Sequence, residues 1–444
     1  MVSIIKNKVR LLDIHTREVL RKSIASTIVK AIGMVLAFLL SIFLGRTIGA
    51  EGLGIINLSN RIITLSLMFC LFGVRTVLVK NVSIGYNLKK WISIKSYMHT
   101  AYIFNGLLSI FIVTILLLST PWLTKDVFNE PRLKIPLAIA IISMVPQTFS
   151  RIFSAGVNGF RKIWQSNLVD QTLSIVIVLI ILSAFYFLNK EITIIRVAIA
   201  YAIGRLVVAV TMGVYWNKLF SYKAQPNFIL KQVLKPALPL LWISISSVIA
   251  ANADAIMLGW LSDTKQVGLY TVAARIALLT SFFLQVTNSV ISPKLAGLFA
   301  ENKKKEMQKM LQQTTKGLVF IAGVPLIIFI IFGKQILGLW GEEFIVSYPI
   351  LVILSVGQFF NISTGCSGLL LIMCGYEKYH GYISFSFVIL NLTLNYILIS
   401  NYGAVGAAIA SAITVIGENI TKVILSRNKV GVLTIPVSLK TNKK

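Results

Sequence analysis

Long uninterrupted apolar runs dominate this 444-residue chain. About a dozen of them reach roughly 20 residues, the length that a helix needs to cross a bilayer. Hydrophobic residues make up 56% of the chain and charged residues only 13%, and the mean hydropathy is +0.81. This composition excludes a globular enzyme with a membrane anchor, a secreted disulfide scaffold and a nucleic-acid binder, although the net charge is +28. Because backbone groups in lipid must be satisfied within a helix or a closed barrel, the runs predict an all-α polytopic membrane protein.

Breaks marked by charge, proline or glycine divide the runs into twelve expected spans: 24–45, 54–78, 98–120, 135–157, 167–188, 192–216, 236–261, 267–293, 314–333, 348–373, 380–400 and 402–425. A polar stretch at 217–235, which contains Pro226, separates an N-lobe at 24–216 from a C-lobe at 236–425. Residues 1–23 lack a signal-peptide pattern and mix apolar with basic residues, so we expect a helix on the membrane surface. Residues 426–444 are expected to form a basic cytoplasmic tail.

The connections between spans carry the positive charge unevenly. With the N-terminus inside, 29 lysines and arginines fall in cytoplasmic segments and 7 in outer connections, when Lys422 is counted with the C-terminal end. Lysine and arginine are enriched on the cytoplasmic side of membrane proteins. The charge therefore predicts cytoplasmic termini and contact with anionic lipids of the bilayer, and not a nucleic-acid partner.

The two expected lobes resemble each other in sequence. An offset of 214 residues aligns Leu44-Gly45 with Leu258-Gly259, Gly54 with Gly268, Arg61-Ile62 with Arg275-Ile276, and Leu65 with Leu279. Six helices per repeat is an even number, so both halves enter the membrane in the same orientation. The repeat predicts two parallel six-helix lobes around a central cavity, an arrangement that is typical of transporters.

Several motifs resemble the bacterial polysaccharide flippases of the O-antigen type. The motifs run through nearly the whole chain: Leu44-Gly45-Arg46 with 49–54, 267–275, Ser292-Pro293-Lys294, 341–344, Gly357-Gln358, 375–378 and 403–410. The superfamily of these proteins also holds lipid II flippases and multidrug and toxic-compound extrusion antiporters. The resemblance implies a cavity lined by helices 1, 2, 7 and 8, and substrates that are oligosaccharides on a polyprenyl diphosphate carrier.

Seven cations fall inside the expected spans, when Lys316 and Lys422, at the inner ends of theirs, are counted with the cytoplasmic segments. Arg61, Arg205 and Arg275 lie too deep for their side chains to reach the headgroups easily, and an ion at mid-bilayer costs about 2.5 to 3.5 kcal/mol on insertion scales. Lys30, Arg75 and Arg151 lie nearer the inner ends of their spans and either line the pathway or anchor it, whereas Arg196 is best read as an anchor. Arg61 and Arg75 stand 14 residues apart on the second expected span and share nearly one face, so one stripe of this helix offers cation sites at two depths.

These cations predict a positively charged pathway for a diphosphate, because guanidinium groups bind phosphate oxygens bidentately. Asn57 and Asn252 are expected to add polar contacts along it. The alternative is pairing between arginines and the intramembrane acids Asp170, Asp254 and Glu418 for helix assembly. Asp254 has Leu40 as its counterpart in the first half, so it is a candidate for ion coupling, with H+ or Na+, or for a gate that pairs with Arg61 or Arg275.

The sequence thus predicts a non-enzymatic flippase of the bacterial inner membrane that uses alternating access and requires no cofactor. Its expected partners are the lipid-linked oligosaccharide and, as candidates, polysaccharide polymerases. The alternatives are an ion-coupled multidrug or cation antiporter and a membrane glycan polymerase. Cys70, Cys366, Cys374 and three isolated histidines show no metal-ligand spacing, so no metal site is expected.

Overall fold

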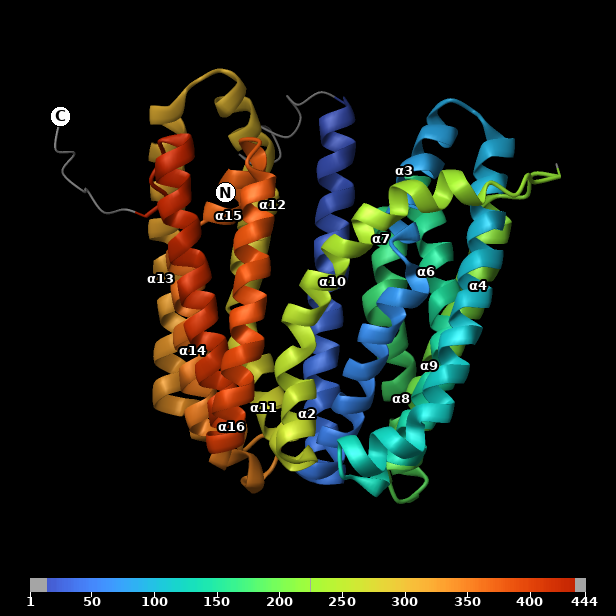
Figure 1. The fold of residues 1–444 in the computed structure, drawn as a ribbon, viewed down its shortest axis with the longest axis vertical. Helices are drawn as coiled ribbons and strands as arrows, with labels where there is room; N and C mark the ends of the chain where they lie inside the picture. Colours follow the sequence, from blue (N-terminus) through green and yellow to red (C-terminus); the bar gives the residue numbers. More distant parts are fainter. Residues whose placement is uncertain (1–13, 224, 436–444) are drawn as a thin grey trace. The chain divides into compact units, whose positions relative to one another are not determined.

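The computed structural model describes residues 14–223 and 225–435, except for the side chains of residues 14–25, 169–171 and 242–243. Every regular element in these ranges is helical (Figure 1). The expected surface helix at 1–23 lies largely outside the described residues, as do the side chain of Asp170 and the end of the tail, 436–444. Contacts within the described residues define two compact units, in which unit 1 comprises 14–43, 62–126 and the described part of 130–245, and unit 2 the other described residues.

Two helices are far longer than one bilayer crossing. α2 (Ile14–Leu71) has 58 residues and α16 (Glu377–Val430) has 54. A straight helix of that length would exceed 80 Å, against a hydrocarbon core of about 30 Å. Each is interrupted by one glycine with positive φ, Gly49 at 68° and Gly403 at 54°, a backbone conformation that glycine adopts without steric cost. Each therefore supplies two spans.

Within the described ranges, eight helices are long and apolar enough to cross a membrane, and a bent pair, Thr264–Leu278 with Ser281–Ala300, provides a ninth crossing. Dividing α2 and α16 at their glycines, and adding the shorter apolar helix Ser174–Phe187, accounts for the twelve expected spans. The all-α polytopic fold is confirmed. Several helices extend past the apolar runs, because backbone hydrogen bonds continue a helix whether or not its side chains are apolar.

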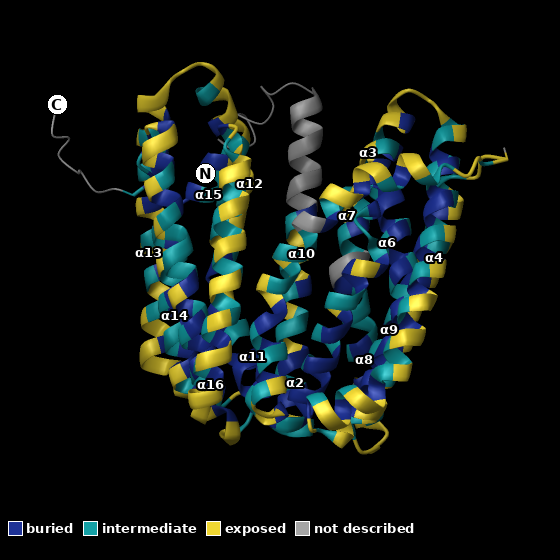
Figure 2. Cartoon of the chain, viewed as in Figure 1, coloured by how far each residue is buried: buried dark blue, intermediate teal, exposed yellow. Residues whose placement is uncertain are grey.

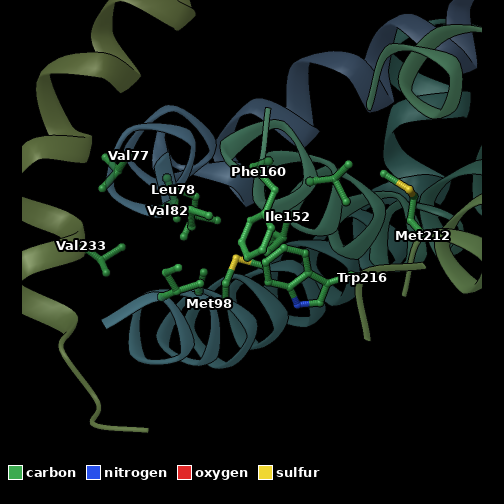
Figure 3. Packing of buried hydrophobic residues seen from close by; sticks show 14 of the residues in the cluster. Val77, Leu78, Val82, Met98, Ile152, Phe160, Met212, Trp216 and Val233 are labelled. Carbon is green, nitrogen blue, oxygen red and sulfur yellow. The ribbon is translucent and has the colours of Figure 1, made fainter. Parts of the chain in front are cut away.

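Unit 1 contains the parts of α2 outside 44–61, the first half of α10 (Leu230–Leu261), and the elements between them. These elements are α3 (Val74–Asn87), α4 (Trp91–Trp122), η1 (Leu123–Val127), η2 (Pro131–Leu133), α5 (Lys134–Ile142), α6 (Met144–Gly159), α7 (Ile163–Asn167), η3 (Leu168–Leu173), α8 (Ser174–Phe187) and α9 (Ile194–Leu219). Its core gathers side chains such as Met98, Ile152, Phe160 and Trp216 from α4, α6, the following turn and α9 (Figure 3). By contrast, α4 exposes Leu107, Phe111 and Leu118, as expected for a helix that faces lipid (Figure 2).

Unit 2 contains residues 44–61 of α2, residues 127–129, the second half of α10 and all later elements. These are α11 (Thr264–Leu278), α12 (Ser281–Ala300), α13 (Lys304–Leu337), η4 (Glu342–Ser347), α14 (Tyr348–Ser363), α15 (Ser367–Met373) and α16. Asp263 caps α11 by accepting a hydrogen bond from the Gln266 amide at 2.7 Å. Residues 44–61 belong to the first sequence repeat, so this segment of α2 packs among helices of the second repeat.

Candidate functional site

The crossing of α2 and α11 in unit 2 has almost no space between the two backbones. A Cβ atom added to Gly54 would lie 1.7 Å from the Thr264 carbonyl oxygen, and one added to Gly268 would lie 2.0 Å from the Ala50 carbonyl oxygen. Only glycine permits this approach, as at other close helix contacts in membranes. The repeat offset of 214 residues relates Ala50 to Thr264 and Gly54 to Gly268. The two sequence repeats therefore cross at equivalent points.

Polar contacts flank this crossing at the Gly49 kink. The Ala50 amide donates a 2.7 Å hydrogen bond to Oε1 of Glu343, which caps the helical segment that follows the kink. Arg46 Nε donates to the Leu339 carbonyl oxygen at 2.7 Å. Residues 44–54 and 341–344 form separate motifs in the sequence, and these hydrogen bonds join them in the structure.

Arg61 lies seven residues beyond Gly54 and bonds to α10. Its Nη1 atom donates 3.0 Å hydrogen bonds to the Ala251 carbonyl oxygen and to Oδ1 of Asn252. The Asn252 amide in turn donates to the Val248 carbonyl oxygen at 2.7 Å. Within the described residues, the hydrogen bonds of Arg61 thus go to neutral oxygens, while its charge lies within electrostatic reach of Asp254.

Asp254 accepts hydrogen bonds from three neutral side chains on other segments. Tyr270 on α11 donates to Oδ2 at 2.5 Å, Ser411 on α16 donates to the same oxygen, and the Asn395 amide donates to Oδ1 at 2.7 Å. Asn395 is fully buried, and its own Oδ1 has no hydrogen-bond partner in the described part of the chain. The cluster gathers oxygen atoms around one carboxylate inside an apolar bundle.

Sequence analysis missed these partners of Asp254. A signal was present, because Asn391 and Asn395 stand four residues apart and Ser411 and Thr414 three residues apart, so each pair shares one helix face. The structure links the two faces, since the Asn391 amide donates to the Thr414 hydroxyl at 3.3 Å.

The cations of unit 1 lie on different helices. Arg205 on α9 donates a 2.7 Å hydrogen bond from Nη1 to the Ser143 hydroxyl and lies over the Tyr201 ring at 5.9 Å. Arg151 on α6 is close enough for electrostatic repulsion with Arg205. The structure therefore brings two of the predicted cations together inside unit 1.

The remaining predicted residues have less distinctive surroundings. Lys30 on α2 is exposed, while Arg75 on α3 and Arg275 on α11 are partly buried. The Asn57 amide donates to the Leu53 carbonyl oxygen of its own helix at 2.8 Å.

Two expectations about charged positions are wrong. The continuous helix face for Arg61 and Arg75 does not exist, because Phe72 and Gly73, both with positive φ, break the helix between them. Lys422, counted with the C-terminal end, lies inside α16 with 8% exposure, and its Nζ atom is 2.6 Å from Oε1 of Glu418. The Ser384 hydroxyl donates to the same oxygen at 2.7 Å, so Glu418 is neutralised locally.

Comparison with known proteins places the chain in a family. A family model described as polysaccharide biosynthesis protein matches residues 19–299, which is more than half of the sequence. The chain belongs to this family. A second family model, MatE, matches residues 239–397.

Two curated relatives match shorter stretches. The probable low-salt glycan biosynthesis flippase Agl15 of Haloferax volcanii is 27% identical over 175 residues, which cover 38% of this chain and 36% of the relative. The capsular polysaccharide biosynthesis protein CapF of Staphylococcus aureus is 26% identical over 204 residues, covering 45% of this chain and 52% of the relative. The chain thus spans about half or less of each relative.

Solved structures share the fold over nearly the whole chain. An inward-facing multidrug resistance MATE family transporter of the MOP superfamily superimposes with a TM-score of 0.73 at 13% identity, covering 91% of this chain and 98% of that one. The lipid II flippase MurJ in an inward closed conformation gives 0.70 at 17% identity, covering 92% and 87%. The predicted likeness in fold to multidrug extrusion transporters and lipid II flippases is confirmed.

Proposed function

We propose that this chain is a flippase that moves polyprenyl-diphosphate-linked oligosaccharide units from the cytoplasmic to the outer leaflet of the bacterial inner membrane. Its product would feed assembly of O-antigen, capsule or exopolysaccharide, with polymerases as downstream partners. The family description and the names of both relatives support a role in surface glycan assembly. The proposal requires transport without covalent chemistry, and no cofactor.

The proposal depends most on the position of Arg61 and on its hydrogen bonds. A guanidinium inside an apolar helix is costly, and this one donates its hydrogen bonds to neutral oxygens while Asp254 lies within electrostatic reach, so we assign it an anionic ligand in the transport cycle. A diphosphate fits because its oxygens accept paired hydrogen bonds from one guanidinium. With a headgroup charge of about −2, a membrane potential negative inside would favour export by roughly 4.6 kcal/mol per 100 mV.

The crossing at Gly54 and Gly268 supports alternating access. It lies near the expected outer ends of two spans and joins helices from the two sequence repeats. A path to the outer leaflet requires this crossing to separate. In the proposed cycle the crossing is the closed gate on the outer side, and the Glu343 contact with Ala50 stabilises it.

The Asp254 cluster is the proposed site of ion coupling, for H+ or Na+. The carboxylate and the unpartnered Oδ1 of Asn395 are oxygen ligands in one buried place. Binding of a cation there would change the charge that Arg61 experiences from Asp254. Coupling and substrate affinity would then be linked electrostatically. Asp254→Asn should remove the dependence of transport on the coupling ion.

Transport of a fluorescent lipid-linked oligosaccharide in proteoliposomes tests the function. Arg61→Ala should abolish arrival of the sugar in the distal leaflet, whereas Arg61→Lys should retain part of it because the charge remains. Arg196→Ala is the matched control, since Arg196 donates to the backbone of Glu191 and lies over Phe185 at 5.9 Å. Wild-type transport by Arg61→Ala, at equal protein levels, would refute the assignment.

An ion-coupled antiporter of multidrug or cation type is the second candidate, favoured by the MatE match over residues 239–397 and by the intramembrane Asp254. Efflux of a lipophilic cation dye from the same proteoliposomes separates the two functions. Dye efflux without sugar translocation would establish the antiporter and exclude the flippase.

A further inference from the structure

An apolar groove of about 250 Å³ runs beside the C-terminal end of α16 in unit 2. Ile420, Val423 and Ile424 of α16 form one wall, and Leu433 and Ile435 of the following segment form the other. Nothing in the proposed transport cycle uses this groove.

The second wall is fixed by hydrogen bonds to the rest of unit 2. The Leu433 amide donates to Oε1 of Gln308 at 3.3 Å, and the Gln312 amide donates to the Ile435 carbonyl oxygen at 3.2 Å. The Thr434 hydroxyl donates to the Thr364 carbonyl oxygen at 2.8 Å. The groove is therefore a built feature with two ordered sides.

The groove is open on the side of α16 where Ile420 and Ile424 are exposed. Ile420 and Ile424 are 45% and 54% exposed, which is costly in water and favourable against hydrocarbon. At about 100° per residue, Ile420 stands roughly 200° around the helix from Glu418. The groove thus lies on the face of α16 opposite Glu418, and its lining shares no residue with the Asp254 cluster.

Positive charge lies at one end of this groove. Thr364, Arg427 and Asn428 complete its lining, and the Arg427 side chain is exposed. A second groove, of about 240 Å³, borders Gly431 at the start of the same terminal segment and is lined by Lys304, Lys305 and Lys309. The local field therefore favours an anion beside the apolar groove.

We propose that this groove binds an anionic phospholipid, with one acyl chain along the isoleucines and the headgroup phosphate at Arg427 and Asn428. Its volume is below the roughly 300 Å³ typical of small-molecule pockets, and its walls offer few polar groups, which suits a hydrocarbon chain and not a glycan. Residues 440–444 carry three lysines, so like charge to Arg427 disfavours this stretch as the occupant. The lipid would hold unit 2 at the leaflet rich in anionic lipids.

Native mass spectrometry of the purified full-length chain tests this proposal by titration with phosphatidylglycerol or phosphatidylcholine. We expect one site with several-fold preference for phosphatidylglycerol. Arg427→Gln should weaken the binding of phosphatidylglycerol about fivefold, which is the effect of one cation near a membrane surface. Ile424→Trp should fill the groove and weaken the binding of both lipids, while the charged residues stay the same. Lys378→Gln, which removes one exposed charge from the start of α16, is the matched control and should have no effect.

Three results would overturn the proposal. Equal affinity for the two lipids would exclude recognition of the headgroup, and normal binding by Ile424→Trp would exclude the groove. Displacement of phosphatidylglycerol by undecaprenyl phosphate at lower concentration would assign the site to a prenyl carrier instead. Melting temperatures measured without added lipid establish that each variant is folded. Sugar transport is not part of the readout, so this test is independent of the flippase assignment.

Discussion

Gly54→Ala should open the crossing between α2 and α11. The added methyl carbon would lie 1.7 Å from the Thr264 carbonyl oxygen, whereas real Cβ contacts are essentially never shorter than 3.0 Å. The two backbones must therefore move apart by about 1.3 Å, and no rotamer change relieves a clash with a backbone atom. Overpacking typically costs about 1 to 3 kcal/mol, and the upper value corresponds to a roughly hundredfold shift away from the closed state.

Labelling of Asn57→Cys by a membrane-impermeant maleimide measures this opening. Asn57 is partly buried one turn beyond Gly54, and the three native cysteines are buried. In intact cells, labelling should be at least tenfold faster in the Gly54→Ala background. Gly297→Ala is the matched control, because nothing lies within 4 Å of a Cβ built there. Equal labelling rates in the two backgrounds, with both proteins folded, would show that this crossing is not the gate.

Three further variants test neighbouring contacts. Gly268→Ala should act in the same direction as Gly54→Ala but more weakly, since its Cβ would need to move only about 1.0 Å from the Ala50 carbonyl oxygen; the same labelling assay checks this. Glu343→Gln should accelerate labelling about fivefold, because a charged cap is worth about 1 kcal/mol, and an unchanged rate would remove this cap from the gate. Lys422→Met should lower the melting temperature by several degrees by leaving the partly buried Glu418 without its ion-pair partner, and adding Glu418→Gln should restore most of the loss. If the double variant is as unstable as the single one, the ion pair is not the cause.

Much of the fold could be predicted because hydropathy is a local property. Each span can be recognised in a window of about 20 residues. The repeat appears as matching glycines and arginines at one offset. The same reasoning failed where a helix breaks without a strong local signal. Phe72 and Gly73 lie inside an apolar run, so the sequence pattern continues while the helix does not.

Candidate site residues divide in the same way. A charge in an apolar run is visible in the sequence, so Arg61 and Asp254 could be named, but their partners could not. Tyr270, Ser411 and Asn395 look like ordinary polar residues on their own helices. They become a cluster only because three segments that are distant in sequence pack around one carboxylate.

The sequence by itself determined the membrane class, the twelve spans, the two repeats and the presence of deep cations, because each depends on composition and spacing along one stretch of chain. Only the tertiary structure decided that Gly54 meets Thr264 and that Glu343 caps Ala50. Both contacts depend on which helix faces pack together across more than 200 residues. No local pattern of side chains encodes those choices.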